Sequence, residues 1–90
     1  MKIVINACYG GFSLSRAAME VCGTNSAYDE DQRFNPALIG MVERNPNIAG
    51  GRYTHLQVVE IPDNATDYEI DEYDGWETVL YVVDGKIHRI

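Results

Sequence analysis

Two Asp-Gly dipeptides, Asp74-Gly75 and Asp84-Gly85, punctuate the last part of this 90-residue chain. Asp-Gly is the strongest short signal for a two-residue hairpin, because both central residues of a type I′ turn need a positive φ. The segments before, between and after the dipeptides are rich in β-branched and aromatic residues, which favour strands. The sequence therefore predicts a three-stranded antiparallel meander, which any fold of this chain must accommodate.

The two turns also fix which residues of the meander lie opposite one another. The first pairs Tyr73 with Trp76, Glu72 with Glu77, Ile70 with Val79 and Tyr68 with Tyr81. The second pairs Val83 with Lys86, Val82 with Ile87 and Tyr81 with His88. Glu72 opposite Glu77 is unusual, because like charges directly across a strand pair are destabilising. This pairing predicts an unseen cation, a nearby arginine or a shifted register.

The rest of the chain carries strand and helix signals in turn. Short β-branched runs predict strands over residues 2–7 and 56–61. Asn35-Pro36, a good N-cap followed by a residue suited to the first helical position, predicts a helix over 36–44. Residues 24–34 show no periodicity and are expected to form a loop.

Another helix is predicted after the first strand. It has Ser13 or Ser15 as N-cap and Gly23 as its C-terminal stop. Its apolar residues recur at the spacing of one helix face, which predicts a buried stripe. These residues are Leu14, Ala17, Ala18, Val21 and Cys22.

Together these elements predict one small α/β or α+β domain that spans residues 1–90 in the order β-α-α-β-β-β-β. We expect a mixed sheet whose C-terminal strands form the antiparallel meander, with two helices on one face. Because a core this small leaves little stability to spare, we also expect a homo-oligomer.

The composition excludes several classes of function. A net charge of −7 repels the phosphate backbone of long nucleic acids, so we expect no binding to them. No apolar run approaches the roughly 20 residues that span a bilayer, so no membrane association is expected. The N-terminal segment lacks the pattern of a secretory signal, and the two cysteines then indicate a cytoplasmic protein with reduced thiols.

The negative charge is concentrated in one stretch. From Glu60 to Glu77 the chain has 8 acidic residues and no Lys or Arg. Such a stretch is typical of a divalent-cation site, a mimic of nucleic acid or an acidic face that binds a partner. Its simpler interpretation is a solvated face of the sheet.

The segment from Cys8 to Arg16 joins a buried strand to a helix through two glycines and two serines. Backbone amides and the positive end of the helix dipole can hold an anion there, and aromatic faces can stack a base. Arg52 and Tyr53 follow another glycine pair and are predicted to assist. A tight strand-to-helix turn with an ordinary serine cap is the alternative. The predicted ligand-binding residues are Tyr9, Gly10, Gly11, Phe12, Ser13, Ser15, Arg16, Arg52 and Tyr53.

No motif in the chain predicts catalysis. Cys8 would need a histidine to act as a nucleophile, and neither His55 nor His88 lies in a recognisable signature. We therefore expect a structural thiol, no catalytic residues and no enzyme activity. Without CxxC or HxxxH spacing, no metal site is expected, and nothing indicates a cofactor.

The opening MKIVINACYGGFSLS, the Asn35-Pro36 helix and the closing LQVVEIPDNATDYEIDEYDGWETV resemble a widespread family of short phage and prophage proteins, and residues 24–34 depart from its pattern. That family is similar in turn to the small anti-CBASS sponges of phages. The resemblance implies a non-catalytic oligomer that sequesters a cyclic oligonucleotide immune signal, with a pocket formed by Tyr9–Ser15 and by arginines and aromatics across a subunit interface. The alternative function is an acidic interaction module, a phage inhibitor of a host protein, that acts through residues 60–77.

Overall fold

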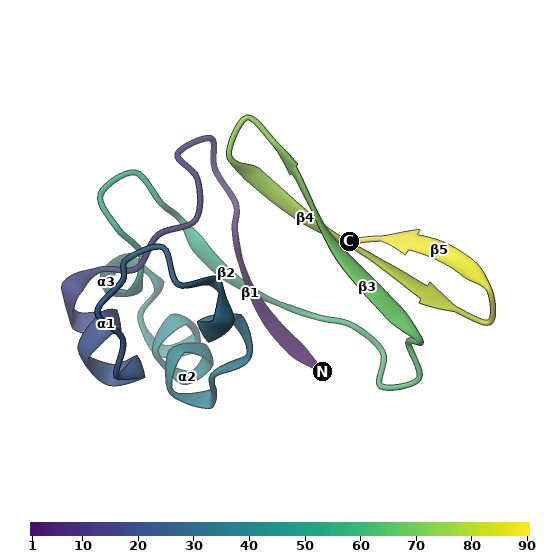
Figure 1. The fold of residues 1–90 in the computed structure, drawn as a ribbon, viewed down its shortest axis with the longest axis horizontal. Helices are drawn as coiled ribbons and strands as arrows, with labels where there is room; N and C mark the ends of the chain where they lie inside the picture. The colour runs from purple at the N-terminus through teal and green to yellow at the C-terminus, as the bar shows by residue number, and fades with distance from the viewer.

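The computed structural model describes residues 1–90 and arranges them in three layers (Figure 1). The predicted order β-α-α-β-β-β-β is confirmed, with a 3-10 helix (η1) and a short third helix as additions. None of the helices has the length and apolar character needed to cross a membrane. In chain order the elements are β1 (Lys2–Asn6), α1 (Arg16–Cys22), η1 (Glu30–Phe34), α2 (Pro36–Arg44), α3 (Pro46–Ala49), β2 (Leu56–Glu60), β3 (Asp67–Tyr73), β4 (Trp76–Val83) and β5 (Lys86–Arg89).

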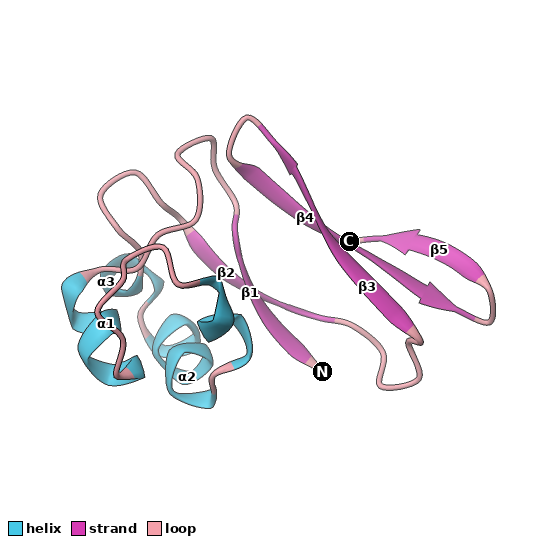
Figure 2. Ribbon diagram, in the orientation of Figure 1, coloured by secondary structure: helices cyan, strands magenta, loops and turns pink.

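The strands form two antiparallel sheets, which corrects the prediction of one mixed sheet. β1 pairs only with β2, and β3, β4 and β5 form the meander. The meander lies against one face of the β1–β2 ribbon, and the helices lie against the other (Figure 2). Two sheets arise because the free edge of β1 is bound by side chains and not by another strand, as the site below shows.

The meander has the predicted register at every pair. Glu72 lies opposite Glu77, Tyr68 opposite Tyr81 and Val82 opposite Ile87. Asp74 and Gly75 have φ values of 55° and 90° in the first turn, and Asp84 and Gly85 have 52° and 75° in the second. These positive φ values are those that a two-residue type I′ hairpin requires, so local turn chemistry determines this part of the fold.

The two predicted helices are present. α2 has the predicted bounds, and the Asn35 side chain accepts a hydrogen bond from the Ala37 N–H at its start. In α1, Ser15 is the N-cap, and Gly23 ends the helix with a φ of 71°. The predicted stripe of α1 is partly wrong, because Ala17 and Val21 are exposed. A helix of only 7 residues buries little surface, and α1 is anchored mainly through the fully buried Ala18.

The hydrophobic core lies on both sides of the β1–β2 ribbon. Alternation along each strand sends Val4 and Leu56 to the helical side and Ile3, Ile5 and Val59 to the meander side. The helical side is completed by Leu14, Ala18, Leu38, Met41, Val42 and Ala49. The meander side is completed by Ile61 and Val79. The ribbon is therefore the central layer and is buried on both faces.

The prediction of a loop over residues 24–34 is partly wrong, because the segment contains η1 and a network of local hydrogen bonds. Asp29 caps η1 by accepting from the Asp31 N–H, and its second oxygen accepts from Thr24 and Gln32. The hydrogen bond from the Thr24 hydroxyl is the main reason that the pKa of Asp29 lies below its ordinary value. This ordered segment carries Arg33 into the interior.

Candidate functional site

A buried ion pair between Arg33 of η1 and Glu77 of β4 joins two parts of the chain that are distant in sequence. Arg33 is 4 % exposed and Glu77 is 5 % exposed. The Arg33 guanidinium donates to both carboxylate oxygens of Glu77, with its Nη1 atom 2.9 Å from Oε1. Its Nη2 also donates to Glu30. Such a bidentate contact is the strongest geometry that a carboxylate and a guanidinium can adopt.

The Arg33–Glu77 pair also binds the backbone of β1. Arg33 Nη1 donates to the Val4 carbonyl at 2.9 Å, and Glu77 Oε1 accepts from the Asn6 N–H at 2.8 Å. A neighbouring parallel strand would bond to the same two groups, one carbonyl and the N–H two residues later. The ion pair therefore takes the place of a strand on this edge, which explains why the meander does not continue the β1–β2 sheet.

Asn6 adds a second buried connection at the end of β1. Its side-chain amide donates to the carbonyls of Cys8 and Gly75, and its oxygen accepts from the His55 N–H. The side chain is fully buried, and no buried side-chain polar atom in the protein lacks a partner. Asn6 thus ties the end of β1 to the turn between β3 and β4 and to the segment before β2.

The surroundings of Arg33 keep its positive charge in place. Burial by itself lowers the pKa of the guanidinium, but the hydrogen bonds from Arg33 to Glu77 and Glu30 outweigh burial and raise this pKa. The guanidinium carbon lies 4.2 Å from the centre of the Phe12 ring, a cation–π geometry. Arg33 is therefore a fixed buried cation.

The unusual pairing of Glu72 with Glu77 now has a physical explanation. The register is as predicted, and of the three alternatives the structure shows the nearby arginine. Arg33 neutralises Glu77, while the Glu72 side chain is exposed and makes no hydrogen bond or ion pair. The like-charge pair is therefore a buried, compensated carboxylate next to a solvated one.

A hollow of about 510 Å³ opens beside the glycine turn. Gly10, Gly11 and Phe12 form one side of it. The other lining residues are Tyr28, Glu30, Ile70, Glu72 and Glu77. Arg33 pairs with Glu30 and Glu77, so Glu72 is the unpaired carboxylate of the lining. The lining keeps a net negative charge beside aromatic side chains, which favours a cationic group over an anion.

Close packing explains one glycine of the turn, and backbone conformation explains the other. A Cβ atom on Gly10 would overlap the Tyr53 carbonyl oxygen, and Gly11 has a φ of 83°. The turn between β3 and β4 presses against the same segment, because a Cβ atom on Gly75 would lie 2.5 Å from the Tyr9 carbonyl oxygen. The glycines thus allow three backbone segments to meet, which favours the tight-turn interpretation.

The hydroxyl groups of the predicted site already have partners. Ser13 shares a hydrogen bond with Thr54 at 2.6 Å. The Ser15 hydroxyl accepts from the Ala18 N–H as the cap of α1 and donates to the Ile48 carbonyl. Both serines therefore stabilise the fold, and neither is directed into the hollow beside the glycine turn.

The remaining predicted residues do not gather at one point. Tyr9 is exposed and packs edge-to-face on Trp76. Arg16 lies at a different hollow, beside α1, and Arg52 lies over the ring of Tyr53 on the surface. Of the nine predicted ligand-binding residues, the structure brings Gly10, Gly11 and Phe12 together in one lining.

The thiol of Cys8 is half-buried and lies against polar atoms of the fold. Its Sγ lies 3.3 Å from Asn6 Oδ1 and 3.2 Å from the Tyr53 carbonyl oxygen, which are the two acceptors within reach of its single proton, and no histidine side chain is among its partners. Cys22 packs against the helical core, and burial raises the pKa of its thiol. A raised pKa keeps this thiol protonated and unreactive.

Sequence reasoning did not identify Arg33, Glu77 and Asn6 as a cluster. The signal that indicates the cluster is the pairing of Glu72 with Glu77, because it demands a cation without saying which one. Comparison of the chain with models of protein families, with curated proteins and with solved structures found no match. The resemblance to phage proteins therefore stays a prediction.

Proposed function

We propose that this chain is an acidic interaction module that binds a basic surface of another protein through the outer face of the meander. The observation that carries the proposal is the placement of Asp67, Glu69 and Asp71. These residues lie opposite Val82, Leu80 and Thr78 and therefore share their face. This face is turned away from the buried Val79 and from the β1–β2 ribbon.

The outer face combines acidic residues with uncovered apolar ones. Leu80 and Val82 are half-buried, and Ile87 on β5 is 73 % exposed. No helix covers this side of the meander (Figure 2). An apolar centre with a polar rim is the usual anatomy of a protein interface. Because the rim of this face is acidic, we expect a partner whose surface has basic residues around an apolar patch.

The negative charge of this face is largely uncompensated. Its single cation is Arg89, whose Nη1 lies 2.8 Å from Asp71. Asp67 accepts only from the N–H of Tyr68, and Glu69 has no side-chain hydrogen bond. Exposed carboxylates of this kind accelerate and orient encounters with basic partners at low salt.

Capture of partners from a bacterial lysate tests this proposal. We expect wild-type protein on beads to retain a basic partner, and the triple variant Asp67→Asn, Glu69→Gln, Asp71→Asn to retain about tenfold less of it. A rise in salt from about 0.05 to 0.5 M should weaken the wild-type interaction, because exposed charges are screened.

A charge-matched control separates this face from overall acidity. Glu20→Gln, Asp31→Asn and Asp84→Asn remove the same number of charges at exposed positions outside the outer face. This control variant should retain the partner as the wild type does. Equal losses from the two variants would show that only net charge matters, and undiminished capture by the first would exclude the outer face.

The sequestration of a small anionic ligand stays a prediction that the hollow beside the glycine turn can test. Phe12 and Tyr28 offer aromatic faces there, but Glu30, Glu72 and Glu77 line the same space. We expect cyclic and linear nucleotides at saturating concentration to leave the melting temperature unchanged, because the acidic lining repels anions. A ligand that does not bind the folded state does not stabilise it. A concentration-dependent rise would support sequestration despite the acidic lining.

A further inference from the structure

The outer edge of β2 presents backbone groups that have no partner. The Ile61 N–H donates to the Met1 carbonyl, and the Ala7 N–H donates to the His55 carbonyl. These two bonds show which residues of β1 and β2 are hydrogen-bonded to each other in the ladder. In an antiparallel pair, alternate residues point their N–H and C=O groups to opposite edges. The even-numbered residues of β2 therefore direct these groups away from β1, and no hydrogen bond to them is present.

This open edge contrasts with the closed edge of β1. On β1, the Arg33–Glu77 pair binds the outward Val4 carbonyl and Asn6 N–H. On β2, Leu56 is fully buried, but Val58 is partly exposed and Glu60 is exposed. The second half of β2 is thus accessible to another strand.

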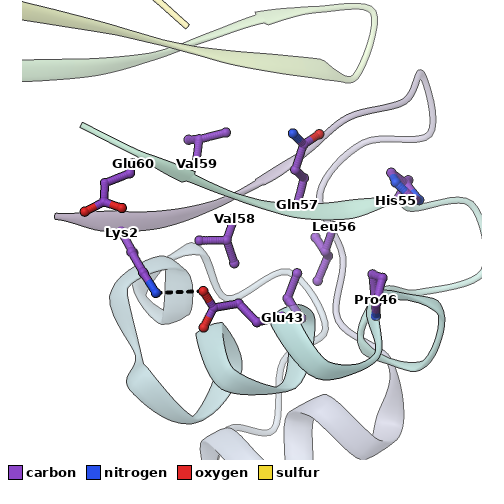
Figure 3. A pocket seen from close by; sticks show the side chains of 10 residues that line it. Lys2, Glu43, Pro46, His55, Leu56, Gln57, Val58, Val59 and Glu60 are labelled. Carbon is purple, nitrogen blue, oxygen red and sulfur yellow. Dashed lines mark hydrogen bonds and ion pairs between the residues drawn. The ribbon is translucent and has the colours of Figure 1, made fainter.

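A groove runs beside this edge, between β2 and the C-terminal end of α2 (Figure 3). It has a volume of about 430 Å³ and contains the whole of β2 in its lining. Leu56 and Val58 point toward the helices, and a Lys2–Glu43 ion pair of 2.7 Å crosses one end (Figure 3). Lys2 and Glu43 are therefore paired with each other, and Glu60 lies at the same end of the groove (Figure 3).

The other two open edges carry charges that oppose self-pairing. On β3, the sequence DYEIDEY would bring carboxylates of two copies together, and on β5, KIHR would bring cations together. Charged residues are the usual protection of an exposed edge. β2, with the sequence LQVVE, has one charged residue at its end and lacks this protection.

We infer that β2 is a homodimer interface, in which two copies pair antiparallel across a two-fold axis to form a continuous four-stranded sheet. With the axis at Val59, the outward groups of Val58 bond to those of Glu60 of the second copy, and the reverse pair forms by symmetry. Each Glu60 then faces an uncharged valine of the second copy. On its other side it lies opposite Lys2 of its own chain in the β1–β2 ladder. This register places no like charges opposite one another.

Proline substitution provides a matched test of the interface. Val58→Pro removes an N–H that points away from β1, so the β1–β2 ladder of the monomer keeps its hydrogen bonds. Ile87→Pro does the same on the open edge of β5. By light scattering after size exclusion, we expect wild type and Ile87→Pro to have the mass of two chains, and Val58→Pro that of one. A monomeric wild type at about millimolar concentration, or a dimeric Val58→Pro, would overturn the inference.

Hydrogen exchange of the wild-type protein provides a measurement that does not depend on the folding of a variant. Amides of Gln57 and Val59 bond within the β1–β2 ladder and should exchange slowly at every protein concentration. Amides of Val58 and Glu60 should become at least tenfold more protected as the concentration rises through the dimerisation range. If they exchange rapidly at all concentrations, or if protection rises at Ile70 or Ile87 instead, β2 is not the interface.

Discussion

Replacement of Arg33 by methionine is expected to lower the free energy of unfolding by about 3–5 kcal/mol, because it leaves the buried Glu77 carboxylate without its cation. Glu77 is 5 % exposed, so water cannot replace the lost partner. The Val4 carbonyl loses its donor in the same variant. Denaturant titration followed by circular dichroism measures the change, and a loss of this size is a large fraction of the total stability of a domain this small.

An exposed ion pair in the same protein supplies the control. Arg89 and Asp71 have side chains that are 55 % and 47 % exposed, and exposed pairs contribute about 0–1 kcal/mol. Arg89→Met should therefore lower the free energy of unfolding by less than about 1 kcal/mol. Similar losses in Arg33→Met and Arg89→Met would refute the claim that the buried pair holds the layers together.

The double variant Arg33→Met, Glu77→Leu separates the ion pair from its contacts with β1. Without Glu77 no charge is left unpaired, so the double variant should be more stable than the sum of the two single changes predicts. It should still be less stable than the wild type, because Val4 and Asn6 each lose a hydrogen-bond partner for the backbone of β1. Strict additivity would show that Arg33 and Glu77 act independently.

The parts of the fold that follow from short segments could be predicted from the sequence. Asp74-Gly75 and Asp84-Gly85 determine the meander and its register, since the turn conformation fixes which residues face one another. Asn35 and Pro36 determine the start of α2 in the same local way. In these segments, the residues that determine the local structure are neighbours in the sequence.

The arrangement of the two sheets depends on contacts between distant residues, and it could not be predicted. Arg33 and Glu77 are 44 positions apart, and nothing local to Arg33 marks it as the arginine that reaches Glu77. The sequence alone therefore leaves the second edge of β1 available to another strand. The position of the glycine turn also depends on distant residues. A Cβ atom on Gly10 would overlap the Tyr53 carbonyl oxygen, and a Cβ atom on Gly75 would crowd Tyr9 and Gly11.

Gly75→Ala is expected to destabilise the protein by about 2–5 kcal/mol, the sum of a conformational cost and a packing cost. A side chain at positive φ costs about 1–2 kcal/mol, and overpacking typically costs about 1–3 kcal/mol. The new Cβ would lie 2.5 Å from the Tyr9 carbonyl oxygen and 2.7 Å from the Gly11 nitrogen. Relief of this overlap moves the turn, whose Gly75 carbonyl accepts from the buried Asn6 side chain.

Gly85→Ala is the matched control, because it isolates the conformational cost. Gly85 is the second residue of the same kind of Asp-Gly turn, with a φ of 75°, and nothing lies within 4 Å of the Cβ that alanine would add. This variant should lose only about 1–2 kcal/mol. The difference between the two alanine variants, measured by denaturant titration, is the contribution of the contact between the meander turn and the glycine turn. If the difference is zero, the two turns do not hold each other in solution, and the contact of Gly75 with Tyr9 and Gly11 adds nothing to stability.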